Sequence, residues 1–261
     1  MDYQIIGKWK INKDKSIGKV LFIVEGSKTE FYVLHKIFHQ VFDYEFEMLN
    51  RNGKYRRYTS KNNLNSSVFV INTEESNIKF IDNSSEYLNN LFQKLIDVYD
   101  FPVNKAAIFY IFDRDIKSNT DKKLIEGLIK SLTSSRNNDG FNMQGLLLLN
   151  YPCIESYVAS NFLSDSFELE FGTGAQLKQY LHINKIYQQK ISEDTIIFAM
   201  HEMVKFFKSI HITDYDVDNF GDVNSKILSI QDNQYLSSET YKLLSLLSIA
   251  FIDLGLIESE G

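Results

Sequence analysis

Carboxylate residues follow three apolar segments of the chain, and their positions suggest the first chemistry to consider. The segments "VLFIV", "AAIFYIF" and "GLLLL" are followed by Glu25, by Asp113 and Asp115, and by Glu155. Continuous apolar runs of this length are typical of strands that are buried on both faces, as in a parallel sheet. Because parallel strands present their carboxyl ends at one edge of a sheet, we expect these carboxylates to converge there.

Carboxylates held close together repel one another, and a divalent cation is one way to keep them ionised. Oxygen ligands without a nearby His or Cys favour Mg²⁺ or Mn²⁺ over Zn²⁺. Mg²⁺ leaves coordination positions for water and phosphate oxygens, so phosphodiester hydrolysis is the natural reaction class. An acid directly after a strand is also common as a helix cap or turn residue. Each acid alone therefore has a purely structural interpretation. The prediction of a metal site rests on the presence of acids after all three strands.

The elements that would position these residues alternate between strands and helices. This order predicts an α/β fold with a largely parallel sheet flanked by helices. From about residue 166 the pattern becomes mostly helical, so we expect an α/β catalytic domain at 1–165 and a helical C-terminal region at 166–261. The predicted strands lie near 19–24, 44–50, 67–72, 105–115 and 145–152, and the predicted helices near 29–38, 84–99 and 121–132 and from 153 onward.

A basic segment, "RNGKYRRYTSK", is the best candidate for nucleic-acid contact in a chain whose net charge is −6. Its polar, Asn-rich surroundings predict a loop or hairpin tip. Cations interleaved with aromatic rings suit phosphate contact and base stacking, although a solvated hairpin tip explains the same pattern. Lys28 and Arg114 lie beside the acids and could also contact phosphate. The candidate cations of the basic segment are Arg51, Lys54, Arg56, Arg57 and Lys61, and its aromatic residues are Tyr55 and Tyr58.

Composition limits the remaining possibilities. Cys153 is the single cysteine of the 261 residues, which excludes an intramolecular disulfide and a zinc site built from cysteines. The start of the chain has no signal-peptide pattern and no apolar run approaches membrane-spanning length, so we expect a cytoplasmic protein without membrane contact. His35 and His39 are four residues apart on a predicted helix and could share a metal, but no third ligand lies nearby in the sequence, so we expect none there.

Three motifs together resemble the TOPRIM domain, which is shared by topoisomerases, DnaG-type primases and OLD-family nucleases. They are "EGSKTE" (Glu25–Glu30), "DRD" (Asp113–Asp115) and "NYPCIE" (Asn150–Glu155). The resemblance is closer to the RloB-like branch, with its "EGxKTE", "DRD" and "NPCFE" elements. The third motif departs from that pattern by the inserted Tyr151 and by Ile154 in place of Phe. The resemblance covers about residues 18–163.

This resemblance implies a Mg²⁺- or Mn²⁺-dependent nuclease of a bacterial anti-phage defence or restriction system, acting on DNA or RNA, tRNA included. Glu25 would be a metal ligand or the general base, and Asp113 and Asp115 would be metal ligands. Glu30 and Glu155 would serve a second ion, but each also fits as an acid in the first turn of a helix.

OLD nucleases carry a fused ATPase, and no ATP-binding motif is present in this chain, so a partner ATPase or another defence-system subunit is implied. The apolar segment "LLSLLSIAFIDLGLI" is suited to packing on the core or to an interface, including one between copies of the chain. The alternative function is a non-catalytic, TOPRIM-like interaction or regulatory subunit of a defence complex.

Overall fold

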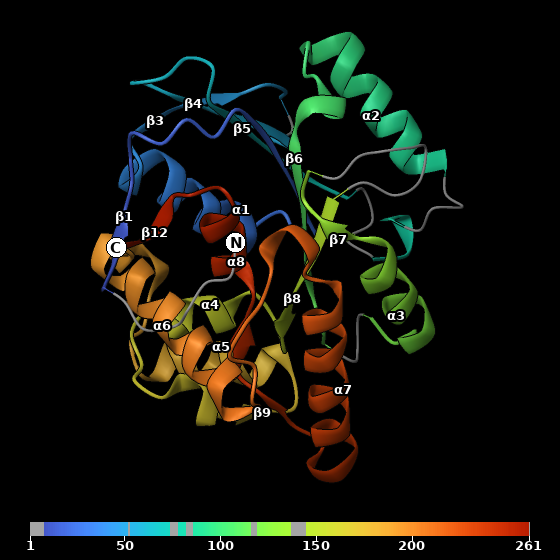
Figure 1. Cartoon of the computed structure of the whole chain (residues 1–261), viewed down its shortest axis with the longest axis vertical. Coiled ribbons are helices and arrows are strands. Elements are labelled where there is room, and N and C mark those ends of the chain that lie inside the picture. The colour runs from blue at the N-terminus through green and yellow to red at the C-terminus, as the bar shows by residue number, and fades with distance from the viewer. Residues whose placement is uncertain are drawn as a thin grey trace.

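An eight-stranded mixed sheet lies at the centre of the molecule (Figure 1). The computed structural model describes residues 8–51, 53–73, 78–81, 86–115, 119–136 and 145–260. In spatial order the strands are β11 (Leu244–Ser245), β8 (Gly145–Tyr151), β6 (Ala107–Asp113), β2 (Lys19–Val24), β5 (Ser67–Asn72), β4 (Tyr55–Ser60) and β3 (Tyr44–Met48), with β7 (Thr133–Ser134) beside β8.

The middle of the sheet is parallel and its margins are antiparallel. Strands β8, β6, β2 and β5 run in one direction, whereas β3, β4, β7 and β11 pair in antiparallel fashion at the margins. The parallel strands are almost entirely buried, which explains why their sequences are continuously apolar rather than alternating. The predicted α/β class with a largely parallel sheet is confirmed, and β2, β6 and β8 are adjacent strands, as the convergence of their acids requires.

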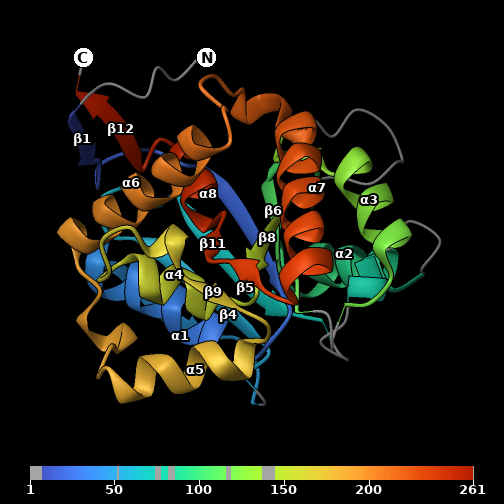
Figure 2. The ribbon, with the colours of Figure 1, turned by 90° about the horizontal axis from the view of Figure 1, so that it is seen from below.

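Helices cover both faces of this sheet (Figure 2). On one side lie α1 (Thr29–His35), the π-helix η1 (Lys36–Val41), α4 (Glu155–Ser160), α6 (Glu193–Ser209) and α8 (Leu247–Asp253), and α5 (Gly174–Ile183) packs on α4. On the other side lie α2 (Glu86–Tyr99), α3 (Lys122–Ser131) and α7 (Gly221–Ser238). Short 3₁₀ turns are η2 (Ile78–Ile81), η3 (Val103–Lys105), η4 (Ser166–Glu168), η5 (Gln188–Lys190) and η6 (Val217–Asn219).

The segment predicted as a loop or hairpin tip is instead largely a strand of the sheet. Strand β4 pairs along its length with β3 on one side and β5 on the other. Its sequence, "YRRYTS", contains two arginines and therefore looks polar. In the structure the arginines are only partly buried, whereas Tyr55, Tyr58 and Ser60 are buried. The prediction was wrong because strand pairing and the packing of these tyrosines outweigh the local polarity.

The region beyond residue 166 carries the predicted helices α5 to α8, but it also contributes strands to the sheets. Strand β11 extends the central sheet, β12 (Ile257–Glu260) pairs with β1 (Lys8–Ile11), and β10 (Tyr241–Lys242) pairs with β9 (Glu170–Phe171). Buried residues from both parts of the chain belong to one hydrophobic cluster. The C-terminal region is therefore built into the α/β core rather than being purely helical.

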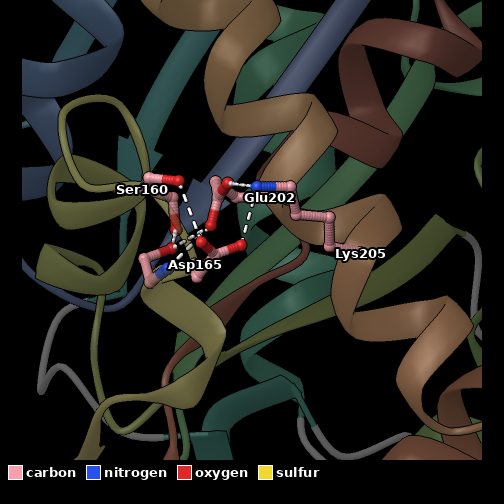
Figure 3. A network of polar contacts seen from close by, with 6 residues as sticks. Ser160, Asp165, Glu202 and Lys205 are labelled. Carbon is pink, nitrogen blue, oxygen red and sulfur yellow. Dashed lines mark hydrogen bonds and ion pairs between the residues drawn. The ribbon is translucent and has the colours of Figure 1, made fainter.

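A buried carboxylate ties α6 to the loop that follows α4 (Figure 3). The carboxylate of Glu202 accepts hydrogen bonds from the Ser166 backbone N–H at 2.7 Å and from Lys205 Nζ at 2.7 Å. Lys205 also contacts Asp165, and the Ser166 hydroxyl reaches Ser160 at the end of α4. Because Glu202 is satisfied by several donors, this network holds the short helix α4 against the C-terminal helices.

Within the described residues, no helix is both long enough and apolar enough to span a membrane.

Candidate active site

Glu25 follows β2 directly, and its carboxylate turns toward the neighbouring strand β6. Its Oε2 atom accepts hydrogen bonds from the backbone N–H of Asp113 at 2.8 Å and from the side-chain amide of Asn119 at 3.1 Å. The Glu25 backbone N–H donates to the carbonyl of Ile111, which continues the β2–β6 pairing to this residue. The ends of β2 and β6 are therefore joined at the candidate site through Glu25.

Asp113 ends β6 and lies between Glu25 and the start of α4. Its Oδ1 atom accepts a hydrogen bond from the Ile154 backbone N–H at 2.8 Å, and Asn150 of β8 approaches the same oxygen at 3.4 Å. Asp113 is aligned with Asn150 in the parallel pairing of β6 and β8. The three strand ends that the sequence indicated therefore meet around Asp113.

Glu30 lies in the first turn of α1 and folds back over the tip of β2. Its Oε1 atom accepts a hydrogen bond from the Gly26 backbone N–H at 3.0 Å. A Cβ atom at Gly26 would lie 2.5 Å from Glu30 Oε2, so any larger residue here would require the Glu30 carboxylate to shift. The motif "EGSKTE" thus places two buried carboxylates, Glu25 and Glu30, beside one glycine.

Glu155 lies in the first turn of α4, and it faces α1 and α5. Its Oε1 atom accepts a hydrogen bond from the Thr29 hydroxyl at 2.9 Å and forms an ion pair with Lys178 Nζ at 3.5 Å. Its other oxygen, Oε2, is buried without a hydrogen-bond partner. Lys178 was not predicted from the sequence because it lies on α5, in the region where no motif is recognisable.

Asp115 is held by the start of α5. Its Oδ2 atom accepts a hydrogen bond from the Gly174 backbone N–H at 2.9 Å. A Cβ atom at Gly174 would lie 2.9 Å from Cys153 Sγ, so the glycine allows α5 to approach the site. Thr173 caps this helix and forms a capping box with Gln176. The segment "FGTGAQ" therefore presents a helix start to Asp115.

These carboxylates act on one another electrostatically. Burial raises the pKa of Glu25 to about 7, and the charges of Glu30 and Asp115 add to the shift, while hydrogen bonds from Asp113 and Asn119 oppose it. Burial raises the pKa of Asp113 well above its usual range, with repulsion from Glu25, Glu30 and Glu155 next in importance. The pKa of Glu30 is also raised, through burial and the charge of Glu155. The five acids Glu25, Glu30, Asp113, Asp115 and Glu155, which we call the acidic cluster, therefore form one interacting group.

Lys178 is the cation that the fold adds to this group. Burial alone would lower the pKa of Lys178, but the charges of Glu155, Cys153 and Asp113 raise it overall. Its side chain remains 57% exposed, so the ammonium lies at the boundary between the acidic cluster and solvent. A cation in this position can contact an anionic group that approaches the acids.

The donor set of the acidic cluster fits Mg²⁺ or Mn²⁺, because it offers carboxylate oxygens and because Glu155 Oε2 has no protein partner. The side chains of the described residues nevertheless include no group of three or more His, Cys, Asp or Glu already arranged around an ion position. Several carboxylate oxygens are instead directed onto protein hydrogen-bond donors. Ion binding would thus require these side chains to rotate away from those donors.

Arg114 lies between two acids of "DRD" in the sequence, yet its side chain is used elsewhere. It is only 3% exposed, and its guanidinium forms an ion pair with Asp232 of α7 at 3.0 Å. It also donates to the Asn119 carbonyl at 2.9 Å. We therefore assign Arg114 a structural role, linking β6 to α7, in place of the phosphate contact expected from the sequence.

The cations of the basic segment are only partly available to a ligand. Arg57 pairs with Glu47 on β3, and Lys61 pairs with Asp43 at 2.6 Å. Arg56 lies 4.4 Å from the ring centre of Phe31. The remaining candidates differ in exposure: Arg51 is exposed, Lys54 is partly buried, and Lys28 is exposed within "EGSKTE".

The two tyrosines expected to stack on bases are committed to the protein interior. Tyr58 is fully buried and Tyr55 is 8% exposed, with its ring stacked on Tyr99 at 5.1 Å. The prediction of base stacking by Tyr55 and Tyr58 is therefore wrong, because both rings serve the packing of β4. Nucleic-acid contact by the cations of this segment stays a prediction.

No family model, curated protein or solved structure matches the chain. The fold and the site define an α/β protein with a mixed, largely parallel central sheet and an acidic cluster at the carboxyl edge of that sheet.

The raised pKa of Glu25 leads to a prediction for stability without divalent cations. A carboxyl group whose pKa is about 7 in the folded protein, against a usual 4.5, binds protons more tightly when folded. Its contribution to stability is present below the usual pKa and is lost as the pH rises through about 7. In EDTA, the melting temperature of the wild type is therefore expected to fall, relative to that of Glu25→Gln, between about pH 4.5 and about pH 7. Parallel curves for the two proteins would contradict this assignment.

Proposed function

We propose that this protein is a divalent-metal-dependent nuclease with a TOPRIM-like active site. The observation that supports this proposal is the acidic cluster, whose members come from the ends of adjacent parallel strands and from the first turns of α1 and α4. A bound Mg²⁺ or Mn²⁺ ion would activate water for attack on a phosphodiester and stabilise the leaving oxygen.

The chain's own residues have separable roles in this proposal. Glu25 and Asp113 would hold the cation at the junction of β2 and β6, with Asp115 as a further ligand and Glu30 and Glu155 serving a second ion. Asn119 orients Glu25 through its side-chain amide. Lys178, exposed beside Glu155, would bind a non-bridging phosphate oxygen of the substrate as a point charge.

The proposed substrate is DNA or RNA, tRNA included. The exposed cations Lys28 and Arg51 would contact its backbone, which explains how a net-negative protein can bind a polyanion locally. As the resemblance to RloB-like and OLD-family proteins implies, the cellular role would be that of an effector in bacterial anti-phage defence, acting with a partner ATPase or another subunit.

The proposal is tested by cleavage assays on DNA and tRNA with Mg²⁺ or Mn²⁺. Glu25→Gln keeps the shape of the side chain but removes a charged ligand, so cleavage is expected to fall by at least about 10²-fold. Glu168→Gln, which changes an exposed acid on η4, serves as the matched control and is expected to retain wild-type activity. Full activity of Glu25→Gln, or activity in EDTA, would refute the proposal.

A second candidate is a non-catalytic interaction or regulatory subunit. It is favoured by the hydrogen bonds that Glu30 and Asp113 already accept from the protein and by the absence, among the described residues, of a group already arranged for an ion. Calorimetric titration separates the two candidates. Binding of Mn²⁺ that is lost in Asp113→Asn supports the nuclease, whereas no binding of either ion favours the interaction subunit.

A further inference from the structure

A second place where side chains suited to metal binding come together lies at the far end of α1. His35 ends α1, and His39 lies within the π-helix η1 that follows it. The centres of the two imidazole rings are 4.9 Å apart, and both residues are partly exposed. Single π-helical turns occur frequently at functional sites, so this irregular turn warrants a specific explanation.

The separation of the two rings matches that of a two-histidine chelate. With metal–nitrogen bonds of about 2.0–2.1 Å and ligand angles between about 90° and 110°, the ring centres of two coordinating imidazoles lie about 4.5–5.2 Å apart. The observed 4.9 Å lies within this interval. The spacing of the two rings is therefore compatible with coordination of one ion by both.

The hydrogen bonds of the two rings are compatible with coordination through Nε2. His39 Nδ1 lies 2.8 Å from the carbonyl oxygen of Tyr44, which can only accept a hydrogen bond, so Nδ1 carries the proton. In the neutral ring the lone pair is then on Nε2. Metal-binding histidines commonly donate their second ring nitrogen to a backbone carbonyl in this way. His35 Nδ1 lies 3.4 Å from the Tyr58 hydroxyl, which accepts a hydrogen bond when Nδ1 carries the proton; in that tautomer the lone pair of His35 is also on Nε2.

The charge state of His35 also suits coordination. Burial lowers the pKa of His35, and the charges of His39 and Arg56 lower it further, so the ring is neutral at neutral pH. Neutral imidazole is the form that binds metals. The positive charge of Arg56 opposes the binding of any cation here, so binding depends on strong nitrogen–metal bonds. This requirement disfavours Mg²⁺ and favours cations that prefer imidazole ligands.

We propose that His35 and His39 form a two-histidine site for a divalent transition-metal cation of the Zn²⁺, Ni²⁺ or Cu²⁺ class, with water completing the coordination. This site is separate from the acidic cluster and differs from it in ligand chemistry. A bound ion would fasten the end of α1 to η1 and, through the hydrogen bond of His39 to Tyr44, to the edge strand β3.

The test uses Cu²⁺ as the probe, with the full chain in the Asp113→Asn background so that the acidic cluster is weakened as a competing site. Paramagnetic resonance of the copper complex at one equivalent is expected to show coupling to two imidazole nitrogens. His35→Asn and His39→Asn are each expected to reduce this to one nitrogen and to weaken binding by at least about tenfold. His211→Asn, at an exposed histidine far along the chain, is the matched control and is expected to change neither.

The second measurement is the melting temperature with and without Zn²⁺, because a ligand that binds only the folded state raises it. This rise in melting temperature is expected in the His211→Asn control and is lost in the double variant His35→Asn/His39→Asn. The melting temperature of the double variant in EDTA shows whether it folds. The proposal is overturned if the two-nitrogen signal persists in the double variant or is absent from the Asp113→Asn parent protein. Since no step depends on nuclease activity, these outcomes are independent of the proposed function.

Discussion

Asp113→Asn is expected to abolish metal-dependent cleavage and, without metal, to leave the protein as stable as the wild type or more stable. The substitution removes the charge that the other acids repel, while the amide oxygen can still accept the hydrogen bond from the Ile154 N–H. Residues that merely support metal ligands typically contribute about 10–100-fold to affinity or activity, so loss of a central ligand is expected to cost at least about 10²-fold. The measurements are cleavage rate, Mn²⁺ affinity and melting temperature in EDTA.

Loss of cleavage together with unchanged or increased stability identifies a functional carboxylate. Charged groups retained at a cost in stability are characteristic of sites that need them for chemistry. Asp253 is the matched control: its raised pKa also arises from burial, but its carboxylate is paired with Arg136 and hydrogen-bonded to Ser135. Asp253→Asn, which alters a buried acid outside the acidic cluster, is therefore expected to leave cleavage unchanged. An Asp113→Asn protein that is much less stable than the wild type would mean that this acid is structural.

Arg114→Ala is expected to lower the free energy of unfolding by about 3–5 kcal/mol, because it leaves the buried carboxylate of Asp232 without its main partner. The two side chains are 4% and 6% exposed, and the pair connects the end of β6 with α7. Lys122 also reaches Asp232, at 3.3 Å, and will offset part of the loss. Urea denaturation monitored by circular dichroism measures the change.

A double-mutant cycle separates this structural role from a role in binding phosphate. Arg114→Met combined with Asp232→Leu removes both charges together and is expected to recover most of the lost stability. The exposed pair Lys61–Asp43 provides the contrast, since breaking it is expected to leave stability almost unchanged. If the double variant is fully stable yet binds nucleic acid much more weakly, Arg114 acts on the substrate after all.

The sequence determined those parts of the fold in which the structure favoured by a segment's own residues is also the one required by its place in the folded protein. Strand β2 was predicted at its observed bounds, Lys19–Val24, because a parallel strand buried on both faces needs an unbroken apolar run. The helix near 84–99 was predicted because its apolar residues repeat at helical spacing, and it is observed as α2. By contrast, β4 was missed, since an arginine-rich strand is recognisable only when β3 and β5 are seen beside it.

The sequence also placed Glu25, Asp113 and Asp115 together, because acids that follow neighbouring parallel strands lie at one edge of the sheet. Only the tertiary structure decided how they are held. Lys178 and the Gly174 N–H come from α5, well beyond the last recognisable motif, and no local pattern predicts that this helix packs against Glu155 and Asp115.

Arg114 illustrates the same division within a single motif. Its neighbours Asp113 and Asp115 contribute to the acidic cluster, whereas its own side chain pairs with Asp232, far along the chain. Backbone position follows from local sequence, since apolar periodicity specifies the strand and where it ends. The partner of a charged side chain depends on which distant segments pack nearby, because an ionised group can be buried only where the fold supplies a compensating charge.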